Sequence, residues 1–246
     1  FYNNYNIHDD IFLGLIFLGI VLLCRNRNYL VFIILSVLII TLLYNRPTKQ
    51  TYSNNSICIL LTTYITDSRL DMYKQRVTDW LDKTPFMIYL VDSNNRGLGI
   101  HNKRYQEFLF DQSTQPYYDN ARNNATRLEK ESILFALSKF RFTEYDYVYK
   151  VTGKYFIPNF NVLTKIKPGA RFILQRQKPF GPIASINSEL VGFKTDILYD
   201  TIYNIPDHVS FEDYLYSIIY LSCQRLPKLK LNDTTPRGDG SILTSL

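Results

Sequence analysis

The sequence predicts an α/β domain with a mostly parallel sheet, preceded by one or two transmembrane helices. From residue 56 onward, apolar runs of strand length alternate with segments of helical periodicity, and this alternation is typical of parallel sheets covered by helices on both faces. Before residue 45, two long runs contain no charged residue. The chain has 246 residues, 46% of them hydrophobic, which suffices for one such domain and an added segment.

The uncharged runs at 11–24 and 29–44 predict a membrane anchor within residues 1–45. Each run is slightly shorter than the roughly 17 to 25 apolar residues of a spanning helix. A double pass of two short spans and a single pass with an interfacial segment therefore both remain open. The basic residues flanking the runs do not decide whether the C-terminal domain is lumenal or cytoplasmic. Residues 46–55 are polar and predict a linker.

The first strand and helix of the domain are expected at 56–64 and 66–83. The strand is a continuous apolar run with β-branched residues, which predicts burial on both faces. The helix is predicted because Leu70, Tyr73 and Val77 recur at helical spacing. A strand followed by a helix in this way is the beginning of a parallel crossover unit.

The middle of the chain continues the same alternation. A second apolar run at 85–95 predicts a strand, and a shorter run at 105–113 predicts a third. Residues 123–140 have the most regular helical periodicity in the chain and predict a helix. The apolar run at 145–152 predicts the strand that follows it.

The last third of the chain is expected to complete the domain. Residues 169–177 and 188–198 predict two more strands, and 210–226 predict a helix. We therefore place the domain at 56–233. Residues 234–246 contain several turn-forming residues and predict a flexible C-terminal tail.

Polar and basic side chains follow three of these strands at their carboxyl ends, where open parallel sheets bind ligands. These residues are Thr62, Thr63, Tyr64, Asp92, Ser93, Lys150, Thr152, Gly153 and Lys154. Carboxylates and hydroxyls suit a ribose or base, and ammonium groups suit a diphosphate. No GxGxxG or GxxxxGK[ST] pattern is present, which argues against dinucleotide-binding and P-loop sites.

The stretch K-V-T-G-K-Y, residues 150–155, follows a helix with internal acids, L-E-K-E-S-I-L-F-A-L. Together with strand ends in Thr-Thr-Tyr and Asp-Ser, it resembles the GT-A (nucleotide-diphospho-sugar) glycosyltransferases. It is similar to a branch of bacterial and large-virus surface-glycan enzymes with a K-x-T-G-[RK]-Y motif. The resemblance covers about 56–225. It implies a single Rossmann-like domain, a nucleotide-sugar donor and a glycan or lipid-linked acceptor.

The resemblance also implies roles for the donor-site residues. The nucleoside would be held by Thr62, Thr63, Tyr64, Asp92 and Ser93, Glu131 would face the cleft, and the diphosphate would lie at Lys150, Thr152, Gly153 and Lys154. Most relatives carry an Asp-x-Asp pair that binds Mn or Mg, and this chain has none. We therefore predict no metal ligand, and the divalent cation stays open. Lys150 and Lys154 would instead stabilise the departing diphosphate, Lys150 as a catalytic group; otherwise both are surface lysines beside a turn.

An inverting transfer requires a base next to the acceptor hydroxyl, whereas a retaining transfer does not. In inverting relatives the base lies at the start of a late helix, which makes Glu212 and Asp213 the catalytic candidates. Ser210 and Asp213 also fit a helix capping box. Asp196 and Asp239 are further candidates.

Composition excludes several other classes of protein. The three cysteines and three histidines show no metal-binding spacing, so neither a disulfide framework nor a structural zinc site is expected. The net charge of +6 is too mild to predict nucleic acid as a partner. Two alternatives remain: a nucleotidyltransferase, although the glycine-rich loop it requires is missing after the first strand, and a catalytically inactive, membrane-tethered nucleotide- or glycan-binding protein.

Overall fold

A computed structural model describes residues 56–118, 124–176, 186–218, 223–227, 229–236 and 242–245. These residues belong to the second of two units into which the chain divides, Thr51–Leu246. The runs 11–24 and 29–44 and the linker 46–55 lie outside the described residues. Among the residues described, no helix combines the length and apolar character needed to cross a membrane.

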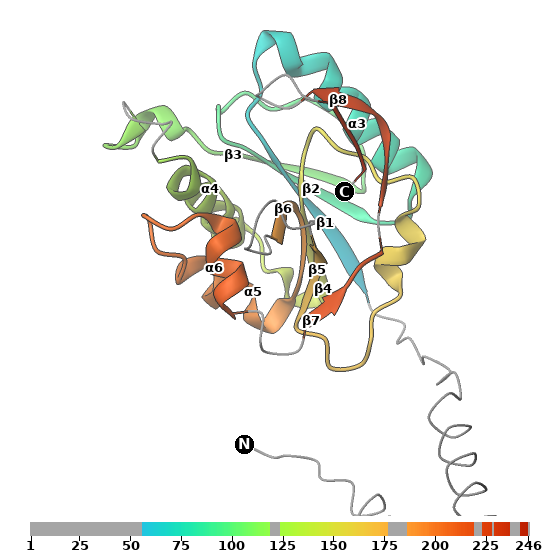
Figure 1. The fold of residues 1–246 in the computed structure, drawn as a ribbon. Helices are drawn as coiled ribbons and strands as arrows, with labels where there is room; N and C mark the ends of the chain where they lie inside the picture. The colour runs from blue at the N-terminus through green and yellow to red at the C-terminus, as the bar shows by residue number, and fades with distance from the viewer. Residues whose placement is uncertain are drawn as a thin grey trace, which may run out of the picture. The chain divides into compact units, whose positions relative to one another are not determined.

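The core of the described domain is a seven-stranded sheet in the order β3-β2-β1-β4-β6-β5-β7 (Figure 1). Strands β1 to β4 pair in parallel, and β6 is antiparallel to both of its neighbours, β4 and β5. The prediction of a mostly parallel sheet is therefore confirmed. The strands are β1 Ile57–Thr63, β2 Met87–Asp92, β3 Tyr105–Leu109, β4 Tyr147–Thr152, β5 Phe172–Arg176, β6 Ile186–Lys194 and β7 Cys223–Arg225.

Helices cover both faces of this sheet, as the apolar strands predicted. Alternate residues of β1 enter two separate cores: Ile59 and Leu61 belong to one, Cys58 and Leu60 to the other. The first core is covered by α3 (Leu70–Lys83), and the second by α4 (Ala125–Lys139), α5 (Thr195–Tyr203) and α6 (Phe211–Ile218). Figure 1 shows α3 on one side of the sheet and the other three helices on the opposite side.

Short 3-10 turns occur at Asp67–Arg69, Gln112–Thr114, Phe142–Glu144 and Phe160–Thr164. The turn at Asp67–Arg69 leads directly into α3. This helix is anchored by Trp80, whose indole N–H donates to the carbonyl oxygen of Tyr155 at 3.0 Å. The bond ties α3 to the segment that follows β4, so this helix helps to position the carboxyl end of that strand.

Two expected elements are replaced over their last residues by an element of the other kind, a helix or a strand. The strand expected at 188–198 ends at Lys194, and α5 begins at the next residue. Ile197, Leu198 and Ile202 then fall on one buried helical face, whereas the sequence prediction placed Ile197 and Leu198 in the strand. The helix expected at 210–226 is described only to Ile218, and residues 223–225 of the expected range form strand β7 instead.

The C-terminal segment also differs from expectation. β8 (Lys230–Pro236) and β9 (Ile242–Ser245) pair antiparallel in a separate two-stranded sheet. Part of the segment expected to be a flexible tail therefore forms a strand. The partner strand begins inside the predicted domain, and the two strands are separated by five residues that include Gly238 and Gly240. Such a short glycine-containing connection is a hairpin signal, which the sequence prediction interpreted as a flexible tail.

A charge cluster on α3 gives the fold a pH-dependent contribution. Asp79 is 4% exposed and lies 2.6 Å from Lys83 Nζ and 3.3 Å from Arg76 Nη1. Burial alone would raise the pKa of Asp79, but the hydrogen bonds and charge of Lys83, with Gln75 and Arg76, hold it below its ordinary value of 3.8. The group therefore stabilises the fold above that pH, and this stabilisation is lost as the pH falls through the lowered pKa.

We predict that Asp79→Asn lowers the free energy of unfolding at pH 7 by about 1–2 kcal/mol, because the charged acceptor of these hydrogen bonds is lost. The difference from the unchanged protein should shrink below pH 3.8, where the aspartate itself becomes protonated. Urea unfolding at several pH values measures it. A difference that stays constant down to pH 2 would contradict the prediction.

Candidate functional site

Three of the predicted donor-site segments meet at one edge of the sheet. Thr62 is the register partner of Thr152, and Thr63 is the partner of Asp92. The backbone N–H of Gly153 donates to the carbonyl oxygen of Thr62 at 2.8 Å. The carboxyl ends of β1, β2 and β4 are therefore side by side, as the strand order requires.

Gly153 allows the chain after β4 to pass close to β1. A Cβ atom at this position would lie 2.2 Å from Cγ2 of Thr63 and 3.2 Å from the carbonyl oxygen of Thr62. The first distance is far below van der Waals contact, so a larger residue would displace one of the two segments. This glycine is therefore required by packing between the strand ends.

Lys150 lies inside the protein, on the face of β4 that α4 and α6 cover. Its side chain is 2% exposed, and its ammonium nitrogen lies 2.5 Å from Oε1 of Glu129. The same nitrogen donates to the carbonyl oxygen of Ser188 at 2.8 Å and lies 5.3 Å from the centre of the Phe211 ring. The structure therefore places this cation in an enclosed ion pair beside the carboxyl edge.

Glu129 is the residue at this edge that the sequence reading missed. Besides pairing with Lys150, its Oε1 accepts a hydrogen bond from the Thr62 hydroxyl at 3.5 Å. The missed signal is helical spacing: Glu129, Ile133 and Ala136 are separated by four and three residues, so they share the face of α4 that meets the sheet. An acid on that face requires a partner.

Glu131, the acid chosen from this helix, points elsewhere because two residues rotate a helix by about 200°. Its Oε1 lies 3.7 Å from Nε of Arg127, and Arg127 also lies 3.4 Å from Asp207. The guanidinium of Arg127 covers the Tyr117 ring at 3.6 Å. Burial, with the nearby negative charge of Glu131, raises the pKa of Tyr117 to about 12. This cluster fastens the start of α4 to the segment before it.

The two candidate bases at the start of α6 have different environments. Glu212 accepts a hydrogen bond from the Ser188 hydroxyl. Asp213 is exposed, and its backbone N–H donates to the Ser210 hydroxyl at 3.0 Å, which is the capping contact that the sequence allowed. Glu212 therefore adjoins Lys150 through Ser188, whereas Asp213 does not.

Five residues from five elements thus form a continuous series of polar contacts, which we call the Lys150 chain. Its members, in order of contact, are Thr62, Glu129, Lys150, Ser188 and Glu212. The chain joins β1, α4, β4, β6 and α6 across the sheet. Three of its members were predicted for the site from sequence.

Asp92 is completely buried and organises the backbone at the ends of β1 and β2. Its Oδ1 accepts from the backbone N–H of Ile65 at 2.8 Å and from the Thr63 hydroxyl at 3.3 Å. Its Oδ2 accepts from the backbone N–H of Arg96 at 2.8 Å. Ser93 adds a bond from its hydroxyl to the carbonyl oxygen of Thr63 at 2.8 Å. These contacts shape the turns that border the edge.

Lys154 is the more accessible of the two predicted cations. Its side chain is 21% exposed, and Nζ lies 3.5 Å from Oε1 of Glu189. Its backbone carbonyl accepts from Nε of Arg76 at 3.2 Å. Nearby at the edge, the Tyr64 hydroxyl lies 3.5 Å from that of Tyr118, and this hydrogen bond is the main cause of the raised pKa of Tyr64.

Two further acids, Asp196 and Asp146, lie away from this edge. Asp196 is exposed and pairs with Lys194 at 2.6 Å, and Asp239 lies outside the described residues. Asp146, at the beginning of β4, accepts from the backbone N–H of Ser56 at 2.8 Å. Within the described ranges, no group of three or more His, Cys, Asp or Glu residues could hold a metal ion.

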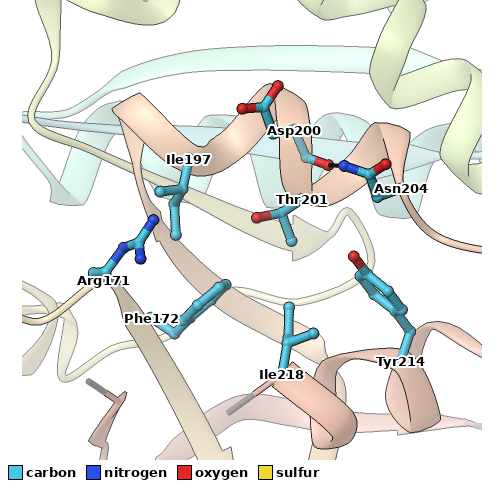
Figure 2. A pocket seen from close by; sticks show the side chains of 8 residues that line it. All are labelled: Arg171, Phe172, Ile197, Asp200, Thr201, Asn204, Tyr214 and Ile218. Carbon is cyan, nitrogen blue, oxygen red and sulfur yellow. Dashed lines mark hydrogen bonds between the residues drawn. The ribbon is translucent and has the colours of Figure 1, made fainter. Parts of the chain in front are cut away.

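A cavity of about 210 Å³ lies at the other end of the sheet, near the beginning of β4 (Figure 2). Figure 2 shows its walls contributed by β5, α5 and α6. The lining residues are Arg171, Phe172, Ile197, Asp200, Thr201, Asn204, Tyr214 and Ile218. None of the residues predicted for donor binding belongs to it, so it is separate from the carboxyl edge.

The fold and the site define an α/β protein whose mostly parallel sheet has a polar carboxyl edge. No family model and no curated protein matches the chain. Among solved structures, 42 chains match. They include the glycosyltransferase GlyE of Streptococcus pneumoniae TIGR4, with a TM-score of 0.40 and 9% identity over 70% of this chain and 46% of that one.

The apo form of GlyE matches with a TM-score of 0.39 and 10% identity, over 69% of this chain and 45% of that one. The galactosyltransferase LgtC, in complex with donor and acceptor sugar analogs, matches with a TM-score of 0.37 and 10% identity, over 68% of this chain and 72% of that one. This chain therefore spans less than half of GlyE. Similarity of this extent carries no conclusion about its activity.

We predict that Gly153→Ala destabilises the protein by about 1–3 kcal/mol, because the added methyl group overpacks the space next to Thr63. Thr63→Ser removes the methyl group that the new Cβ would meet while retaining the hydroxyl. The double variant should therefore lose less stability than the sum of the two single changes. Chemical denaturation of the four proteins measures this, and simple additivity would contradict it.

We predict that Asp92→Ala lowers the free energy of unfolding by about 2–4 kcal/mol, because two backbone N–H groups lose their acceptor. Asp111 is a matched control, since its carboxylate accepts from the backbone N–H of Ser113 at an exposed turn. Asp111→Ala should cost only about 0.5–1 kcal/mol. Equal losses in thermal or urea unfolding would show that burial does not distinguish the two carboxylates.

Proposed function

We propose that the chain is a membrane-anchored glycosyltransferase that moves a sugar from a nucleoside diphosphate to a glycan or lipid-linked acceptor. One observation carries the proposal: Thr62, Thr63, Asp92, Thr152 and Gly153 are neighbours at the carboxyl edge of a mostly parallel sheet. Open α/β sheets bind nucleotides at this edge. The K-x-T-G-K-Y resemblance supports the transfer reaction, and the uncharged runs at 11–24 and 29–44 support the anchor.

The diphosphate is assigned first to Lys154, because this ammonium group is partly accessible whereas that of Lys150 is enclosed. A cation here would stabilise the negative charge that accumulates on the leaving group. Gly153 would act indirectly, by letting the chain after β4 lie against Thr63 and so positioning the neighbouring Lys154. Chelation with EDTA tests whether Mn or Mg is needed in addition to Lys154.

The nucleoside is assigned to Tyr64 and the hydroxyl groups around it, since the Asp92 carboxylate already accepts hydrogen bonds from protein groups on both oxygens. Asp92 would then act by shaping the turns on which these groups stand. If the reaction inverts, Glu212 is the better candidate base of the two at the start of α6, because Ser188 connects it to the Lys150 chain.

A thermal-shift panel of UDP, GDP, CMP and dTDP, each with and without manganese, tests the donor class. A nucleotide present at about 100 times its Kd stabilises the folded state by about 2.7 kcal/mol, which raises the melting temperature measurably. We expect one nucleoside diphosphate to stand out. The absence of a shift with UDP, GDP and dTDP, in either condition, would refute the proposal.

We predict that Lys154→Ala weakens binding of that nucleotide roughly 10- to 100-fold, the loss of one charge-assisted hydrogen bond. Lys74→Ala, an exposed lysine on α3, is the control and should leave the affinity unchanged. Isothermal titration calorimetry measures both, and equal affinities would exclude Lys154 from the diphosphate site.

Donor hydrolysis with and without EDTA then separates the remaining alternatives. Turnover that survives EDTA and falls in Lys154→Ala supports stabilisation of the leaving group by lysine. Turnover abolished by EDTA indicates a divalent cation. Nucleotide binding without any turnover in the presence of acceptor would instead identify a binding protein that has retained the fold.

A further inference from the structure

We infer that Glu129 binds the hydroxyl groups of the donor sugar and that Lys150 is a positioning residue that holds the Glu129 carboxylate in place. This inference rests on the proposed function and assigns the part of the site that recognises the sugar rather than the nucleotide. It is carried by the contacts of the Lys150 chain at the carboxyl edge.

Lys150 is not available to a ligand. Its side chain is 2% exposed, and its ammonium group is in contact with a carboxylate, a backbone carbonyl and an aromatic ring. A diphosphate could reach it only by displacing Glu129 or moving Phe211. A buried ammonium group that loses its carboxylate is strongly destabilising, so the pair is expected to persist when a ligand binds.

The contacts of Glu129 within the described protein involve only one of its two carboxylate oxygens. Its side chain is 29% exposed, and both of its contacts, with Lys150 and Thr62, are made by Oε1. Within the part of the chain that the structure describes, Oε2 has no hydrogen-bond partner. A carboxylate fixed at one oxygen and open at the other is suited to accept a hydrogen bond from a ligand.

The Glu129 carboxylate lies beside the proposed nucleotide site. Thr62 is the register partner of Thr152, one residue before Gly153, so Glu129 stands next to the strand ends where the nucleotide is proposed to bind. On the other side of Lys150, Ser188 connects to Glu212. The Lys150 chain therefore holds two carboxylates in a defined relation, one on α4 and one on α6, beside the same edge.

A carboxylate at this position favours the sugar over the diphosphate as its ligand. Sugar hydroxyl groups donate hydrogen bonds to carboxylates, whereas a diphosphate is an anion and would be repelled by one. Glu129 should therefore contribute to the affinity for a nucleotide sugar and contribute little to that for the nucleoside diphosphate alone. A site built to bind a hydroxyl group discriminates strongly against a ligand that lacks it.

The test compares binding of matched pairs of ligands to the full chain by calorimetry: UDP with UDP-glucose, GDP with GDP-mannose, and dTDP with dTDP-glucose. For the pair that binds, we expect Glu129→Gln to weaken the nucleotide sugar at least 10-fold and to change the affinity for the nucleoside diphosphate less than 2-fold. Glu144→Gln makes the same chemical change at an exposed position and should alter neither affinity.

Lys150→Met distinguishes positioning from direct contact. If Lys150 positions Glu129, this variant loses affinity for the nucleotide sugar only, and combining it with Glu129→Gln adds no further loss. If Lys150 binds the diphosphate itself, the affinity for the nucleoside diphosphate falls as well, and the inference is overturned. Should either single variant not fold, the double variant, which removes both charges together, gives the same comparison.

The outcomes separate this inference from the function on which it rests. Equal weakening of both ligands by Glu129→Gln, or weakening of neither, overturns the role of Glu129 while nucleotide binding by the unchanged protein still supports the proposed function. If the unchanged protein binds no member of any pair, the proposed function fails, and the inference fails with it.

Discussion

The ion pair between Lys150 and Glu129 is the interaction on which the arrangement of this edge depends. A buried ammonium group is tolerated only where acceptors surround it, and leaving one unpaired costs about 3 kcal/mol or more. Lys150 therefore imposes the positions of α4, which supplies Glu129, and of β6, which supplies the Ser188 carbonyl. Phe211 closes the site from α6, so a single side chain brings three elements together above β4.

Two further residues organise the same edge, and neither of them presents a charge to a ligand. Asp92 accepts backbone hydrogen bonds from the segments after β1 and β2, and Gly153 lets the chain after β4 pass against Thr63. Together they hold three strand ends close enough to act as one surface. Lys154, Tyr64 and Glu129 remain partly exposed at this edge, where Lys154 contacts Glu189 and Tyr64 contacts Tyr118.

Much of the fold could be predicted from local pattern. Continuous apolar runs marked β1, β2 and β4, because strands buried on both faces have no polar alternation, and the spacing of Tyr73 and Val77 marked α3. The misses occurred where two states share one local pattern. Ile197 and Leu198 fit either a continued β6 or the first turn of α5, and in the structure they pack together with Ile202 in the second core. The glycines between β8 and β9 fit both a hairpin connection and a flexible tail, and the tail was predicted.

The sequence by itself determined which polar residues reach the carboxyl edge, because side chains at the ends of parallel strands must lie together once the strands pair. Thr62, Asp92, Lys150 and Gly153 were identified on that basis. Only the tertiary structure decided what each of them contacts. Whether Lys150 faces a ligand or Glu129, and whether Asp92 points outward or toward the backbone of Ile65, depends on which helix covers each face of the strand. The position of a residue in its strand decides whether it lies at the carboxyl edge, but the distant elements that cover it decide which group it contacts.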